Sequence, residues 1–163
     1  MPRVKSRLTR AELLEKVTFQ RYWYEPQRVL IIARHGALVK NREISLFWVE
    51  IFDFEKGVFS GKVLSSPGKG YPWIAIGSTV FFVAPEGWEY PVMVSERYSE
   101  EIELWNVGPC DKCGSVQLLD SPSELLLLQY PATRLETPPV MFEAFCYLCG
   151  GKQILTIKAV SRQ

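Results

Sequence analysis

All four cysteines of the chain occur in two copies of one short motif, CxxCG: Cys110-Asp111-Lys112-Cys113-Gly114 and Cys146-Tyr147-Leu148-Cys149-Gly150. Two residues between the cysteines allow a tight turn to aim both sulfurs at one point, where backbone amides can donate to the thiolates. The glycine after the second cysteine permits the left-handed backbone that completes such a turn. Two turns together supply the four-thiolate tetrahedral shell that zinc prefers. The sequence therefore predicts one zinc site, with Cys110, Cys113, Cys146 and Cys149 as its metal ligands.

The paired motifs resemble those of zinc ribbons, and the resemblance covers about 50 residues around the two motifs. It implies a small β unit held together by one zinc ion. Rubredoxins also use two CxxCG motifs at a comparable separation, so iron is the alternative metal. A redox dithiol or a pair of disulfides would also use paired cysteines, although a lone redox motif would not need a second copy with a matching glycine.

Four thiolates around a divalent ion fill its coordination shell. Because no position stays open for water or substrate, we expect a structural and not a catalytic metal. The ion would also contribute much of the folding free energy of its unit, since a thin ribbon buries little apolar surface.

A second stretch with possible chemistry reads VLIIARHG from Val29 to Gly36 and is followed by Asn41. It resembles the signature of histidine phosphatases, which implies His35 as the phosphorylated nucleophile and Arg34 and Asn41 as phosphate-binding residues. That mechanism requires a second histidine in the phosphate pocket, and His35 is the only histidine of the chain. We therefore expect a strand that ends in a polar turn, no catalytic residues and no enzyme.

The elements that must position the cysteines are short strands. Residues 116–119 after the first motif and Met141 to Phe145 before the second are expected to be strands, with a loop between them. Gly/Pro/Ser-rich linkers long enough to separate domains are absent from the sequence. We expect this unit to pack directly on the part of the chain that precedes it.

That preceding part contains a series of short apolar runs separated by turn residues. The expected strands are Val29–Ala33, Leu46–Phe54, Val58–Leu64, Thr79–Val83 and Tyr90–Val94. In the second of them, Phe47, Val49 and Ile51 share one face, and Trp48, Glu50 and Phe52 share the other. The glutamate in the second row indicates a partly solvated face. Five short strands with tight turns predict a small antiparallel barrel or strongly curved sheet.

The N-terminal region carries a helix signal. Thr9 and Glu12 have the spacing of a capping box, and Leu13, Leu14 and Val17 follow at helical spacing, which predicts a helix over residues 9–19. The expected fold class is mainly β: a small barrel or curved sheet with an N-terminal helix and a C-terminal zinc ribbon. The expected division is a basic helical arm (1–27), a β-rich barrel-like domain (28–102) and a zinc-ribbon unit (103–163).

The central region also resembles an uncharacterised bacterial domain family typified by the YegJ-like proteins. The matching stretches, in order, are Phe47–Ile51, Gly61–Leu64 with Pro67, Ile76–Gly77, Val80–Phe82 and Trp88. The turn from Gly68 to Trp73 departs from the family's spacing. The resemblance implies a small β-rich binding domain without an established activity.

Composition limits the class of protein. An apolar share of 47% and a charged share of 23% are typical of a folded soluble chain. No signal-peptide pattern occurs, and no apolar run approaches the roughly 18 residues of a membrane span. We expect a cytoplasmic protein, because reduced thiols in pairs are there more often metal ligands than disulfides.

Charge divides unevenly along the chain. Residues 1–42 carry ten basic and three acidic side chains, a net charge of +7, and the remainder carries −6. Glu100, Glu101 and Glu103 are expected to form a solvated acidic edge. The first candidate function is a protein interaction module that uses exposed aromatic residues such as Trp73, Trp88 and Tyr90. The alternative is nucleic-acid binding through the basic region, and the oligomeric state stays open.

Overall fold

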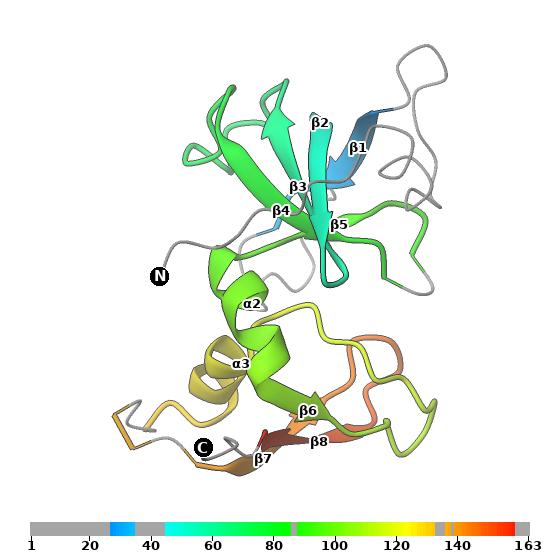
Figure 1. Ribbon diagram of the computed structural model, residues 1–163, viewed down its shortest axis with the longest axis vertical. Helices are drawn as coiled ribbons and strands as arrows, with labels where there is room; N and C mark the ends of the chain where they lie inside the picture. Colours follow the sequence, from blue (N-terminus) through cyan, green and yellow to red (C-terminus); the bar gives the residue numbers. More distant parts are fainter. Residues whose placement is uncertain (1–26, 35–44, 86–87, 133–135, 138, 159–163) are drawn as a thin grey trace. The chain divides into compact units, whose positions relative to one another are not determined.

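The computed structural model describes residues 27–34, 45–85, 88–132, 136–137 and 139–158. The described residues form two compact units, one ending at Ser95 and the other beginning at Glu96. Figure 1 shows the elements of each unit. The predicted helix over residues 9–19 lies outside the described residues.

The first unit is a closed barrel of five strands: β1 (Arg28–Ile32), β2 (Leu46–Glu55), β3 (Val58–Val63), β4 (Thr79–Val83) and β5 (Val92–Val94). Consecutive strands pair antiparallel, whereas β1 and β5 pair parallel through Ile32 and Val92. The predicted barrel is confirmed, but it is not wholly antiparallel. Five strands that alternate in direction leave the first and last running the same way, so the pair that closes the barrel must be parallel.

Strand β2 shows the alternation that the sequence predicts. Phe47, Val49 and Ile51 are buried, and the positions between them are only partly buried. The register with β3 shifts between Ile51 and Asp53, which leaves Phe52 as an extra residue with 46% of its surface exposed. Such a bulge bends the strand and increases its twist, as closure of a small barrel requires.

The hairpin between β2 and β3 turns through Lys56 and Gly57, as predicted. Both residues have positive φ angles, 54° and 83°, which is the backbone of a tight hairpin turn that matches the twist of the strands. Strand β5 is shorter than predicted and begins after Pro91, whose nitrogen has no hydrogen to donate to a neighbouring strand. The Pro91 carbonyl instead accepts a hydrogen bond from Ile32 N at 2.8 Å.

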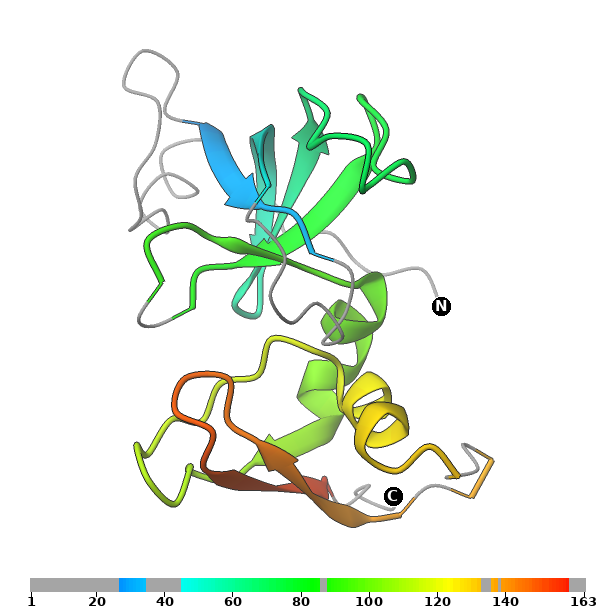
Figure 2. The same cartoon turned by 180° about the vertical axis from the view of Figure 1, so that it is seen from behind.

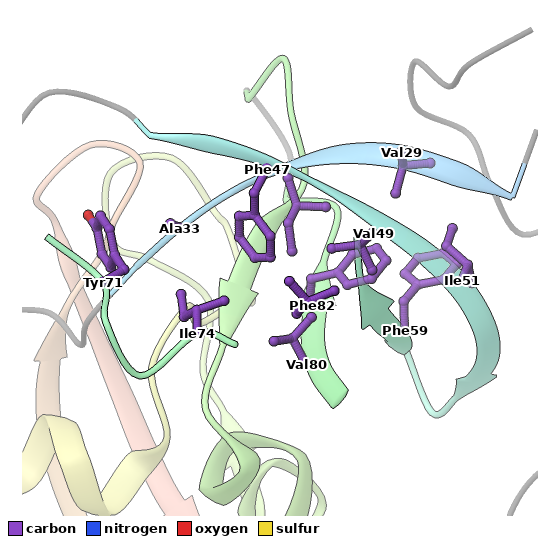
Figure 3. Packing of buried hydrophobic residues seen from close by; sticks show 12 residues of the cluster. Val29, Ala33, Phe47, Val49, Ile51, Phe59, Tyr71, Ile74, Val80 and Phe82 are labelled. Atoms are coloured by element: carbon purple, nitrogen blue, oxygen red, sulfur yellow. The ribbon is translucent and has the colours of Figure 1, made fainter. Parts of the chain in front are cut away.

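The barrel interior is filled by one cluster of buried apolar side chains (Figure 3). Every strand from β1 to β4 contributes to it, and Tyr71 and Ile74 join it from the loop between β3 and β4. The packing is tightest at Gly61, where a side chain would collide with that of Val49 and lie 3.1 Å from the Glu50 carbonyl oxygen. Glycine therefore lets β2 and β3 approach closely inside the barrel.

The second unit contains α2 (Glu96–Glu101), the 3₁₀ turn η1 (Ile102–Leu104), β6 (Trp105–Val107), α3 (Pro122–Gln129), β7 (Met141–Phe145) and β8 (Lys152–Ile157). Its three strands form an antiparallel sheet in the order β6-β8-β7 (Figure 2). One sheet face is buried, with Trp105 and Phe142 in edge-to-face contact and Leu155 fully covered.

Strand β7 has the predicted bounds, but the predicted strand over residues 116–119 is wrong. That segment has no strand partner, although Leu118 and Leu119 are buried. The Ser115 and Gln117 carbonyls accept hydrogen bonds from the Gln153 side chain, at 2.8 and 3.5 Å. The Gln153 side chain thus pairs with backbone carbonyls that a neighbouring strand would pair in a sheet.

The segment between the two cysteine motifs, predicted to be a loop, contains α3. Ser121 caps this helix: its hydroxyl accepts from Glu124 N at 3.2 Å, and Glu124 Oε2 accepts from Ser121 N at 3.4 Å. Pro122 occupies the first turn, where its missing N–H is not needed. None of the described helices is long and apolar enough to span a membrane.

Candidate metal centre

The two cysteine motifs come together in the second unit. The Sγ atoms of Cys110, Cys113, Cys146 and Cys149 all lie within 4.8 Å of one another. The Cys110 and Cys149 sulfurs are 3.3 Å apart, and those of Cys113 and Cys146 are 3.6 Å apart. Both pairs join a sulfur of one motif to a sulfur of the other, so residues more than 30 positions apart meet at one point.

The first motif forms a tight turn after β6. Cys110 N donates to the Ser115 carbonyl at 2.9 Å, and Gly114 N donates back to the Cys110 carbonyl at 3.0 Å. Gly114 has a φ of 78°, the left-handed conformation predicted for it. Lys112 N lies 3.4 Å from Cys110 Sγ and donates to it.

The second motif repeats this turn between β7 and β8. Cys146 N donates to the Gly151 carbonyl at 2.7 Å, Gly150 N donates to the Cys146 carbonyl at 3.0 Å, and the φ of Gly150 is 77°. Leu148 N donates to Cys146 Sγ at 3.4 Å. The two turns therefore present their sulfurs and amides in the same way, because the same local sequence builds both.

Hydrogen bonds join the first turn to the start of β8. Asp111 N donates to the Lys152 carbonyl at 3.0 Å, and Lys152 N donates to Asp111 Oδ1 at 2.9 Å. Gly151 lies against the first turn: a side chain there would collide with Cys110 Sγ and lie 2.7 Å from Asp111 Oδ1. Sequence reasoning missed Gly151, because its role depends on contacts with Cys110 and Asp111 that no local motif indicates.

The four cysteines differ in their surroundings. Cys110 and Cys146 are buried, whereas Cys113 and Cys149 are exposed. The backbone amides of Cys113 and Lys112, with the neighbouring sulfurs, outweigh burial and lower the pKa of Cys110 to about 6. The backbone amide of Ser115 lowers the pKa of Cys113, but desolvation and the three neighbouring sulfurs raise it to about 12. The turn amides thus favour the thiolate of Cys110, whereas burial and the neighbouring sulfurs oppose that of Cys113.

The donor set fits a bound divalent metal. With zinc–sulfur bonds of about 2.3 Å, a tetrahedral site places its sulfurs about 3.8 Å apart, comparable with the separations found here. A dication also removes the electrostatic obstacle to four neighbouring thiolates. Four sulfurs suit zinc and iron alike, so this arrangement supports metal binding without choosing between the two.

A group of polar residues that sequence reasoning missed holds the segment after the first turn. Gln153 is fully buried and donates to the Ser115 carbonyl. Tyr98 donates its hydroxyl to the Leu118 carbonyl at 2.9 Å, and Tyr147 donates to Gln117 Oε1 at 3.1 Å. Burial, followed by the charge of Asp120, raises the pKa of Tyr98 well above its usual range, so its hydroxyl stays a donor.

The remaining predicted residues have mixed outcomes. The prediction that Glu101 belongs to a solvated acidic edge is wrong: its carboxylate is largely buried and accepts from Ser123 N at 2.9 Å and Ser123 Oγ at 2.6 Å. Arg34 follows β1, but His35 and Asn41 lie outside the described residues. The resemblance to histidine phosphatases thus stays untested.

Comparisons with known proteins do not identify a family. No protein-family model matches the chain, and no curated protein or solved structure matches it significantly. The resemblances to zinc ribbons and to YegJ-like proteins therefore gain no support from these comparisons, and functional inference depends on the site itself.

Proposed function

We propose that this protein is a non-enzymatic binding module whose second unit is a zinc ribbon, with one structural zinc ion held by Cys110, Cys113, Cys146 and Cys149. The observation that carries the proposal is the convergence of four sulfurs from two matching turns to within 4.8 Å.

The order of elements supports the ribbon. The first turn follows β6, the second turn joins β7 to β8, and β8 pairs antiparallel with both other strands. The ends of β6 and β7 and the start of β8 lie at the same end of the sheet, so both cysteine-bearing turns meet there. This arrangement supports a ribbon. Zinc is preferred over iron because a purely structural site requires no redox chemistry, and zinc has none.

A site of four thiolates leaves the ion no open position, so we assign the metal no catalytic role. Its effect would be to stabilise the fold of the second unit. The first unit, which contains no proposed ligand, offers large apolar side chains to a partner: Trp73, Ile76 and Trp88 are 50%, 68% and 38% exposed, while Tyr90 is half-buried. Exposed aromatic and aliphatic side chains favour a protein partner.

Nucleic-acid binding is the second candidate, and the net charge of +7 over residues 1–42 favours it. Binding through these residues would weaken steeply with added salt, because phosphate contacts release counterions. Retention on a polyanion column that is salt-dependent and disappears when residues 1–42 are deleted would favour this candidate over a protein partner.

Elemental analysis of the full-length protein, purified under reducing conditions, tests the metal site. We expect one zinc per chain and a colourless solution, whereas a red protein would carry iron. Cys149→Ser should lose most of the metal. Leu148→Ser is the matched control, because Leu148 is an exposed residue of the same turn that offers no ligand; it should keep the metal. A reduced, folded protein without metal would contradict the proposal.

A further inference from the structure

Strand β7 presents an open edge of backbone hydrogen-bonding groups. Two backbone hydrogen bonds lie just before and just after the paired part of β7 and β8: Ile157 N donates to the Val140 carbonyl, and Cys146 N donates to the Gly151 carbonyl. Antiparallel pairing alternates, so Phe142 and Ala144 also direct their N–H and C=O groups toward β8. The intervening residues Met141, Glu143 and Phe145 therefore direct theirs to the opposite side, where no described strand pairs with them.

The side chains of the same three residues lie on the exposed sheet face. Met141 and Phe145 are 58% and 62% exposed, and Glu143 between them is also exposed. On the adjacent strand, Ile154 lies opposite Glu143 and is 51% exposed. A partner could therefore reach the backbone groups and the side chains of these three β7 residues at the same time. The exposed apolar surface continues onto β8 through Ile154.

The two edges of this sheet are not equivalent. Strand β6 is three residues long and its Trp105 is buried, so this edge offers little to a partner. Proteins commonly protect longer edges with lysine, proline or a bulge. Strand β7 reads MFEAF and pairs with β8 in continuous register, so it has no lysine, proline or bulge, and its only charged residue is Glu143.

We propose that β7 binds an extended segment of another protein as a fourth strand of this sheet. The segment places a lysine or arginine opposite Glu143 and apolar side chains opposite Met141 and Phe145. Such strand addition takes affinity from main-chain hydrogen bonds and specificity from alternate side chains. The inference deepens the proposed binding function, and it requires the metal-supported fold of the second unit.

Glu143 is the residue that selects this partner over a second copy of the chain. A symmetric antiparallel pair of β7 strands at full length would put Glu143 opposite Glu143 of the second copy, and like charges directly opposite destabilise a sheet. A shift that removes this clash shortens the paired segment to three residues, either Met141–Glu143 or Glu143–Phe145. Since Glu143 forms no salt bridge with the described residues, its charge is available to a basic side chain.

The test uses the full-length zinc-loaded protein and two labelled, end-capped nine-residue peptides. In both peptides every second residue is threonine. In the first peptide the three central positions between the threonines are valine, lysine and valine. The second peptide has glutamate in place of the lysine. Fluorescence anisotropy should show the lysine peptide binding about two- to five-fold more tightly, the range typical of a cross-strand ion pair. Glu143→Lys should reverse this preference. Glu89→Lys makes the same charge change at an exposed position of the first unit and should not.

Backbone pairing is tested with N-methyl groups on the lysine peptide. Methylation of the amides that face β7 should weaken binding about tenfold or more, because each lost main-chain bond contributes to affinity, whereas methylation of the alternate amides should not. Absence of binding, equal binding of both peptides, or association of the protein with itself through β7 would overturn the proposal. Zinc measured in the same samples separates this failure from failure of the metal site.

Discussion

At the residue scale, the cluster of sulfurs depends on one position that carries no side chain. Gly151 follows the second turn, and a Cβ there would overlap Cys110 Sγ and approach Asp111 Oδ1 to 2.7 Å. Its amide also donates to Cys149 Sγ at 3.4 Å. The residue thus lets β8 pass close to the first turn and supports a sulfur of the second.

We expect Gly151→Ala to weaken zinc binding by about tenfold, the lower end of what is lost when residues that support metal ligands are changed. The added methyl group must displace either the Cys110 sulfur or the start of β8. Competition with a chromogenic chelator measures the affinity. Gly70→Ala is the control, because a Cβ there would meet nothing within 4 Å. Equal zinc affinity of the two variants would show that the site absorbs the methyl group.

The four cysteines could be found from sequence because their spacing within each motif is local and repeated. Gly151 and Gln153 could not be found in the same way. Their roles depend on contacts with Cys110 and Ser115, about 40 positions away in the chain. Residues that support a site from another element carry no spacing signal of their own.

At the scale of elements, the residues that delimit an apolar run were more informative than the run itself. The bounds of β4 and β7 agree with prediction: β4 lies between Gly77 and Pro85, and β7 lies between Pro139 and the second cysteine motif. Residues 116–119 contain buried leucines but no partner strand. Helix α3 is not among the predicted elements, although Ser121 and Glu124 have the same capping-box spacing that predicts the helix over residues 9–19.

The cap of α3 can be tested at Ser121, which is fully buried. Ser121→Ala should lower the free energy of unfolding by about 1 kcal/mol, because Glu124 N loses its acceptor. Ser121→Gly should cost only a few tenths of a kcal/mol, since glycine is a favourable N-cap. Urea unfolding of the zinc-loaded protein, followed by circular dichroism, measures both. If the alanine variant were as stable as wild type, the cap would not stabilise the helix.

At the scale of the whole molecule, the two units differ in what can stabilise them. The barrel encloses a cluster of twelve buried residues and closes its sheet, so it has no open edge. The second unit has a three-stranded sheet and two short helices, and its cysteine turns lie at the ends of the strands. Apolar burial therefore supports the first unit, and the proposed metal would supply much of the stability of the second.

Metal removal should consequently unfold the two units unequally. After zinc is stripped with a strong chelator under reducing conditions, we expect amides of β6, β7 and β8 to lose protection in hydrogen exchange. Amides of β1 to β4 should keep theirs, because no barrel residue is a proposed ligand. Restoring zinc should restore the lost protection and controls for irreversible damage. Unchanged protection in β8, with the zinc demonstrably gone, would mean that packing around Leu155 and Gln153 holds the second unit without the metal.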